Sequence, residues 1–187
     1  MKSLPLLIIL GLIVVLVMSG VGQYNRLVGL DQGVQSQWAQ VNNQLQRRND
    51  LIPNLVGTVK GIAGQEQKVF GDIANARARM AGAAARPIGE QIDAARQMDG
   101  ALGRLLVVVE NYPQLRSQEN FSALQAQLEG TENRLAVERK RYNDVVQQWN
   151  TTVKRFPAML YAGVFGFKDK PFYQVAEAAR AVPKVQF

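Results

Sequence analysis

The chain of 187 residues contains no cysteine and no histidine. Without these two residue types it cannot form a disulfide, a thiolate nucleophile, an imidazole general base or the commonest zinc sites. Its acidic residues are mostly isolated and interleaved with cations, and the sequence has neither a phosphate-binding loop nor a dinucleotide-binding motif. We therefore predict no catalytic residue, no metal, no cofactor and no small-molecule substrate, and thus a protein that is not an enzyme.

The chain also lacks a concentrated basic region, although its formal net charge is +7. Nucleic-acid-binding proteins normally gather their cations on one face or in one arm. Here the excess is spread along the whole sequence, so we predict no nucleic-acid partner. A mild, distributed positive charge suits the anionic headgroups of a membrane surface, and solubility alone accounts for it equally well.

One uncharged apolar run, Leu4–Val21, lies near the N-terminus. As a helix of about 18 residues it extends roughly 27 Å, close to the thickness of a bilayer's hydrocarbon core. We predict a single transmembrane anchor over residues 1–22, followed by a helical domain over residues 23–187. A cleaved signal peptide is the alternative, but the run is longer than the apolar core of such peptides. Lys2 favours a cytoplasmic N-terminus and an exported helical domain.

Apolar residues then recur at alternating spacings of four and three from Val34 to Met80. Twelve of the fourteen positions in this series are apolar, which is a heptad pattern and predicts a long coiled-coil-like helix with one narrow buried seam. The series is Val34, Trp38, Val41, Leu45, Arg48, Ile52, Leu55, Val59, Ile62, Glu66, Val69, Ile73, Ala76 and Met80.

Two breaks divide the remainder of the domain into helices. The segment 81–87 ends in Arg-Pro, and Tyr112-Pro113 interrupts a second helix that we expect over residues 88–110. A third helix is expected from residues 117–121 to about residue 155, and no segment shows the period of a strand. We predict an all-α fold in which the membrane helix precedes an elongated antiparallel three-helix bundle.

Polar residues inside this seam are the candidates for specific interactions. Arg48 on the first helix and Glu138 on the third occupy seam positions, and the antiparallel layout predicts that they form a pair. Pro53 falls within the same heptad pattern, whose phase continues across it, so a kinked helix is favoured over a loop.

After Phe156 the sequence becomes apolar, aromatic and glycine-bearing, and a short C-terminal helix is expected near residues 172–180. This tail has two interpretations. It folds back on the apolar seam of the bundle, or it lies in a membrane interface, where aromatic residues flanked by lysines are common. The residues that carry the second interpretation are Phe165, Phe167, Lys168 and Lys170.

The chain resembles the LemA family of bacterial envelope proteins over nearly its whole length. The most diagnostic element is the motif Arg47, Arg48, Asp50, Leu51, Ile52, Pro53, Asn54, Leu55 and Val56, which is a candidate interaction or kink site. Further matches are Tyr24-Asn25, Trp38, Tyr112-Pro113, Tyr142-Asn143, Phe156-Pro157 and Phe165–Lys168. The resemblance implies one N-terminal transmembrane helix and a long helical body at the bacterial inner membrane, and it transfers no catalytic or ligand residue.

Two functions are compatible with these observations. The first is a membrane-anchored helical scaffold of the cell envelope that forms homo-oligomers and organises the membrane or its proteins. The second is an adaptor or regulatory partner of another membrane protein, such as a membrane protease. Aliphatic residues exposed on both sides of the long helices would favour the scaffold, whereas a single exposed apolar groove would favour the adaptor.

Overall fold

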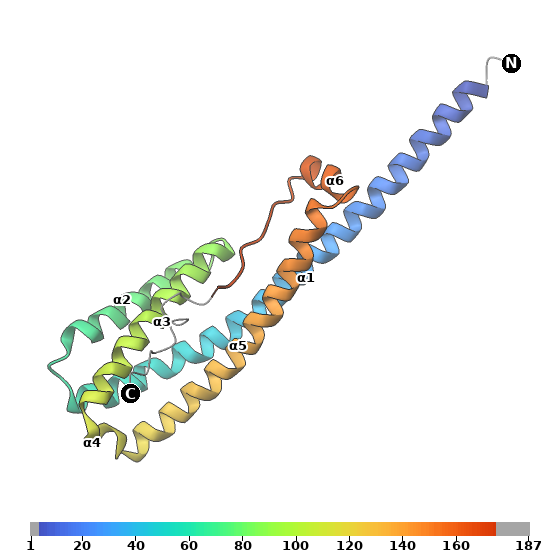
Figure 1. The fold of residues 1–187 in the computed structure, drawn as a ribbon. Helices are drawn as coiled ribbons and strands as arrows, with labels where there is room; N and C mark the ends of the chain where they lie inside the picture. The colour runs from blue at the N-terminus through green and yellow to red at the C-terminus, as the bar shows by residue number, and fades with distance from the viewer. Residues whose placement is uncertain (1–3, 175–187) are drawn as a thin grey trace, which may run out of the picture. The chain divides into compact units, whose positions relative to one another are not determined.

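The computed structural model describes residues 4–174, without the side chains of residues 4–9, 12, 13, 16 and 116 (Figure 1). In this range the chain forms helices and no strand, which confirms the all-α prediction for the described residues. The helices are α1 (Leu4–Ile62), α2 (Gln67–Ala83), α3 (Ile88–Asn111), α4 (Pro113–Arg116), α5 (Glu119–Lys154) and α6 (Ala158–Phe165). They fall into two compact units, residues 1–38 with 141–172 and residues 39–140 with 173–187.

The first unit pairs the early part of α1 with the late part of α5. Trp38 packs edge-on against Tyr142 at 5.3 Å between ring centroids, and Gly20, earlier on α1, lies beside Tyr161 of α6. Low residue numbers on α1 therefore meet high numbers on α5 and α6, so the two chain directions are antiparallel. The buried core of this pair consists of Leu27, Val34, Trp38, Tyr142, Val146, Trp149 and Val153.

Beyond α6 the chain turns and runs back along α5. Gly166 makes the turn with φ = 74°, a left-handed conformation that glycine adopts without strain. Trp149 Nε1 then donates to the carbonyl of Lys168 at 2.9 Å, and the Tyr142 hydroxyl donates to the carbonyl of Pro171 at 2.8 Å. Residues 167–171 therefore fold back on the helices, as the first of the two interpretations of the tail predicted.

In its described part, the second unit packs four long helical segments and the short helix α4, not the three helices that the sequence predicted. Arg79 on α2 donates to Gln97 on α3, and Arg77 on α2 donates to Asn49 on α1, so α2 runs antiparallel to both neighbours. The late part of α1, α2, α3 and the early part of α5 follow one another in up-down-up-down order. Their shared core includes Ile52, Leu55, Val59, Ile73, Met98, Leu105, Leu115 and Phe121.

The extra helix arises because the predicted first helix is two helices. The chain leaves α1 after Ile62, turns through residues 63–66 and returns as α2. The turn contains Gly64, which weakens a helix by about 1 kcal/mol relative to alanine. Both helices place an apolar stripe of helical period on the same core, so the heptad series crosses the turn without a change of phase.

The other predicted boundaries agree with the structure. α2 ends at Ala83 and α3 at Asn111, and α5 extends from Glu119 to Lys154. Pro53 lies inside α1, which confirms a continued helix in preference to a loop. The short C-terminal helix is not present at residues 172–174, and the rest of that predicted segment lies outside the described residues.

A membrane-spanning helix is not found among the residues that could be searched: there, no helix has the length and hydropathy that crossing a bilayer requires. The predicted anchor, residues 1–22, depends on residues 4–9, 12, 13 and 16, whose side chains lie outside the description.

Candidate functional site

Two arginines and two carboxylates from three helices meet in the second unit. Arg48 Nη1 of α1 lies 2.6 Å from Asp99 Oδ1 of α3 and 3.0 Å from Glu132 Oε2 of α5. Arg139, on α5, completes the group through Nη1, 3.0 Å from Glu132 Oε1, and through Nη2, 3.5 Å from Asp99 Oδ2. Each carboxylate therefore bridges both guanidinium groups. We refer to Arg48, Asp99, Glu132 and Arg139 as the ion cluster.

The cations of the ion cluster are more deeply buried than its anions. The residues Arg48 and Arg139 are 2% and 7% exposed, whereas the side chains of Asp99 and Glu132 are 30% and 45% exposed. Burial alone lowers the pKa of the Arg48 guanidinium, but Asp99 and Glu132 raise it, and the balance leaves this pKa above its usual value. Arg48 thus stays charged inside the unit.

An aromatic ring covers one side of the ion cluster. The guanidinium carbon of Arg139 lies 4.7 Å from the centroid of the Tyr173 ring, a distance typical of a cation–π contact. Burial raises the pKa of the Tyr173 hydroxyl, although Arg139 opposes this change. Next to it, Arg96 Nε donates to the carbonyl of Gln174 at 3.2 Å, which holds the chain against α3.

An open groove of about 340 Å³ lies against the ion cluster, between α3 and α5. We call it the α3–α5 groove. Its walls are aliphatic and its edge carries a further carboxylate, Glu129, which accepts a hydrogen bond from Gln125 at 3.0 Å. Besides the four residues of the ion cluster, the groove is lined by Leu102, Gly103, Leu106, Gln125, Leu128 and Glu129.

The ion cluster leaves hydrogen-bonding capacity unused. Arg48 Nε, Arg48 Nη2 and Arg139 Nε are buried and have no acceptor among the described residues. Buried donors are normally satisfied, and an unsatisfied one costs about 1–3 kcal/mol. These buried N–H groups therefore reduce the net stabilisation that the ion cluster gives the fold.

The sequence predicted Glu138 as the carboxylate partner of Arg48, and the structure corrects this: the partners are Asp99 and Glu132. The predicted heptad placed Glu138 in the seam. In the structure the buried positions of α5 include Leu135, Arg139 and Tyr142, so Arg139 faces inward and Glu138 is half-buried. A straight helix drifts from a strict heptad register, which explains the one-residue shift.

The LemA-like motif divides between two faces of α1. Arg48, Ile52 and Leu55 are buried, and Leu51 and Val56 are half-buried. The remaining motif residues, Arg47, Asp50, Pro53 and Asn54, are exposed. On the exposed face Gln46 donates to Asp50 at 2.8 Å, and the Thr58 hydroxyl donates to the carbonyl of Asn54 at 2.9 Å. The motif thus supplies buried core residues, the Arg48 side chain of the ion cluster and a set of exposed residues.

The four predicted tail residues lie in the first unit, apart from the ion cluster along the chain. Phe167 packs edge-on against Trp149 at 5.5 Å, and Lys170 pairs with Asp31 at 2.7 Å. The ring centroids of Phe165 and Tyr24 are 4.8 Å apart, but Phe165 stays 48% exposed. Lys168 is also exposed. Phe167 and Lys170 therefore hold the returning chain, while Phe165 and Lys168 reach solvent.

Sequence reasoning missed Asp99, Glu132, Arg139 and Tyr173 as members of one site. The predicted seam joined the first and third helices, so it offered no reason to choose Asp99, which belongs to the second predicted helix. The spacing of four from Leu135 and three to Tyr142 was the signal for Arg139. Among the described residues no group of acids converges in a way that could hold a metal ion.

Comparison with known proteins decides the family. The LemA family model matches residues 37–187, a span that contains α2 to α6, the motif and the ion cluster. The chain belongs to the LemA family. This LemA protein is also related to three magnetosome proteins.

Magnetosome protein MamQ 1 and magnetosome protein MamQ 2 of Paramagnetospirillum magneticum are each 26% identical to the chain over 176 residues. Magnetosome protein MamQ of Magnetospirillum gryphiswaldense is 25% identical over 175 residues. Each match covers 81% of the LemA chain, but only 65%, 65% and 64% of the respective relatives. The homology is therefore distant, and the chain spans less than two thirds of these relatives' length.

Proposed function

We propose that this LemA protein is a non-enzymatic adaptor, anchored in the bacterial inner membrane, that holds a helical segment of another membrane protein in the α3–α5 groove. The observation that carries the proposal is the groove itself, which combines aliphatic walls with a buried ion cluster. Such a combination of apolar surface and convergent polar groups is typical of binding sites. The anchor rests on the uncharged run Leu4–Val21, and Lys2 favours a cytoplasmic N-terminus with an exported domain.

The heptad seam of α1 supports the adaptor over the scaffold because the seam is already occupied. Each of the residues Val34, Trp38, Val41, Leu45, Ile52, Leu55 and Val59 is at most 5% exposed within the single chain. A second copy therefore cannot pair with α1 through this seam unless the packed helices separate. The α3–α5 groove, by contrast, is open.

The charges of the groove indicate what the partner segment carries. Asp99, Glu129 and Glu132 face two arginines, which leaves one negative charge in excess. An amphipathic helix that places an aliphatic side chain against Leu106 and a lysine or arginine near Glu129 fits both features.

Adjacent residues of α3 provide a matched test. Leu106 lines the groove and is 43% exposed, while Val107 is 57% exposed and does not line it. A photocrosslinking amino acid at position 106, in the full chain in its native membrane, is expected to capture one defined protein, and the same amino acid at position 107 is not. Glu129→Lys should remove the product from position 106. Equal capture at both positions, or capture unaffected by Glu129→Lys, would contradict the adaptor.

A self-associating scaffold is the second candidate, favoured by exposed aliphatic residues outside the groove. Val107 on α3 and Val137 on α5 are 57% and 48% exposed. The mass of the full chain in mild detergent, beside that of a chain starting at Gln23, tests this candidate. Discrete oligomers of both chains would support assembly through the helical domain. Monomers of both would exclude the scaffold and leave the adaptor.

A further inference from the structure

The short helix α6 has the reverse of the usual polarity of a packed helix. Its small residues Ala158 and Ala162 are 4% and 3% exposed, so they form the packed side. Its larger aliphatic residues face outward, together with Phe156, which lies two residues before the helix. In the order of the chain, the exposed residues are Phe156 (77%), Met159 (50%), Leu160 (55%) and Val164 (81%).

These four residues form one exposed apolar surface. Leu160 and Val164 are four positions apart, the spacing at which side chains stack on one face of a helix. Met159 adjoins Leu160 in the sequence, and Phe156 lies in the turn that precedes the helix. A helix that packed on its neighbours only to bury apolar residues would turn this surface inward. A contiguous apolar face of this kind on the surface normally has an occupant. We call it the α6 stripe.

Close packing fixes α6 beside one particular part of α1. A Cβ atom on Gly20 would lie 3.3 Å from Tyr161 Cε1, so the lack of a side chain at Gly20 allows the close approach. Tyr24 contacts Phe165 at 4.8 Å and Phe167 at 6.2 Å between ring centroids. These contacts hold α6 against residues 20–24, where the uncharged run Leu4–Val21 ends.

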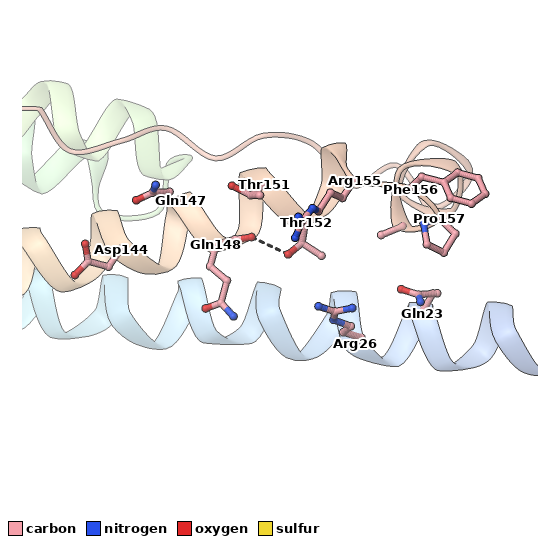
Figure 2. Close-up of a pocket in the computed structure, with 11 residues that line it drawn as sticks. Gln23, Arg26, Asp144, Gln147, Gln148, Thr151, Thr152, Arg155, Phe156 and Pro157 are labelled. Atoms are coloured by element: carbon pink, nitrogen blue, oxygen red, sulfur yellow. Dashed lines mark hydrogen bonds between the residues drawn. The ribbon is translucent and has the colours of Figure 1, made fainter.

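Three cations accompany the α6 stripe: Arg26, Arg155 and Lys168. A groove of about 610 Å³ in the first unit is lined by Arg26 of α1 and by Arg155 and Phe156, which follow α5, as Figure 2 shows. Asp144 lines the far part of the same groove. Phe156 therefore belongs both to the groove and to the α6 stripe. Lys168 follows α6 and is exposed, so cations lie on both sides of the stripe along the chain.

We propose that the α6 stripe lies in the headgroup region of the membrane and that Arg26 and Arg155 bind the phosphates of anionic lipids there. This inference rests on the proposed transmembrane anchor, because the anchor places residues 20–24 at the bilayer surface. Interfacial helices bury one apolar face among the acyl chains and keep cations at the level of the phosphates. At eight residues, α6 is about 12 Å long, too short to cross the bilayer and suited to lie on it.

The absence of native cysteine gives a direct test on the full chain in vesicles. A nitrobenzoxadiazole label is attached to Val164→Cys and, as a control, to Gln35→Cys. Gln35 is an exposed residue of α1 about 22 Å further along the helix than Gly20. In vesicles containing phosphatidylglycerol, the label at position 164 is expected to shift to shorter wavelength. Nitroxide lipids should quench it several-fold more than the label at position 35.

The charge requirement is tested separately. Arg26→Gln combined with Arg155→Gln should reduce the quenching at position 164 in phosphatidylglycerol vesicles to the level seen in pure phosphatidylcholine. The matched control is Arg47→Gln, an exposed arginine of the second unit, which should leave the quenching unchanged. An equal effect of the control variant would overturn the assignment of Arg26 and Arg155.

Alkaline extraction of the same vesicles separates this inference from the proposed anchor. In one outcome the protein resists extraction, but nitroxide lipids quench the label at position 164 no more than the label at position 35. This result would overturn the inference and leave the anchor intact. A shifted label that nitroxide lipids do not quench would assign the stripe to protein contact and overturn the lipid contact. Extraction of the protein would overturn the anchor and this inference with it.

Discussion

Arg47 and Arg48 are neighbours in the sequence with opposite surroundings. Arg48 is 2% exposed and paired with Asp99 and Glu132, whereas Arg47 is exposed. We expect Arg48→Met to destabilise the protein by about 3 kcal/mol, because two partly buried carboxylates then share only Arg139. The expected value lies at the lower end of the range for buried pairs because both carboxylates retain contact with water. Urea unfolding in mild detergent, followed by circular dichroism, measures the change.

Arg47→Met is the matched control for this prediction. It removes the same charge one residue earlier on α1, and we expect no measurable change in the unfolding midpoint. Similar midpoints for the two variants would show that the ion cluster contributes no net stability. That result would favour a role in partner binding, because buried ion pairs can be near neutral for folding.

Tyr142 is the second residue whose burial has a measurable consequence. Burial raises the pKa of its hydroxyl well above the ordinary value of about 10. The folded protein therefore holds this proton more tightly than the unfolded chain does. The stabilisation is complete below about pH 10 and is lost as the pH rises further, towards the folded pKa.

We predict that Tyr142→Phe changes stability differently at two pH values. Near neutral pH the variant should be less stable by about 1 kcal/mol, because the hydrogen bond to the Pro171 carbonyl is lost. Above about pH 10 wild type should lose stability more steeply than the variant. Urea midpoints at about pH 8 and pH 11 test this, and parallel losses in both proteins would exclude Tyr142 as the group responsible.

At the level of helices, local patterns in the sequence predicted most boundaries. Pro113 marked the end of α3, and the heptad period located the buried side of α1, including Arg48. The turn at Gly64 escaped prediction because the apolar period continues across it. An antiparallel helix that packs on the same core preserves that period, so periodicity alone cannot distinguish one long helix from two.

The candidate site was predictable only in part for a related reason. A polar residue in an apolar seam is conspicuous in the sequence, and this identified Arg48. Its partners depend on which helices surround it, and Asp99 comes from a helix that the two-helix seam did not include. The polarity of α6 escaped prediction because a uniformly apolar segment does not reveal which side packs.

The contact between α1 and α6 gives a prediction at this level. Gly20→Leu should push Tyr161 away, because a Cβ atom at position 20 would already lie 3.3 Å from its ring. Gly22→Leu gains the same helix propensity, but a Cβ atom there would meet nothing within 4 Å. Chymotrypsin is expected to cleave α6 faster in the Gly20 variant only. Equal cleavage of both variants would show that α6 is not held by this contact.

For the whole molecule, the grooves and exposed apolar residues constrain the function more than its relatives do. These relatives are the LemA family and, more distantly, the MamQ proteins. Each unit has its own groove and its own exposed apolar residues. In the first unit the groove is lined by arginines, and the exposed apolar residues lie near the end of the uncharged run Leu4–Val21. In the second unit the groove has one carboxylate in excess over its arginines. The opposite charge balance of the two grooves suits lipid phosphates in one case and a cationic helix in the other.

The proposed topology places both units on the exported side of the membrane, and this topology can be measured. Because the chain has no native cysteine, Gln35→Cys in the first unit and Asn54→Cys in the second each provide one exposed thiol. A membrane-impermeant maleimide added to intact spheroplasts should modify both, and a cysteine at Ser3 should react only after lysis. If Ser3→Cys reacts in intact spheroplasts and the other two cysteines are protected, the orientation is the opposite of the proposed one, with the helical domain in the cytoplasm. A cytoplasmic domain could then bind its partner, and the α6 stripe its lipid, only at the inner leaflet.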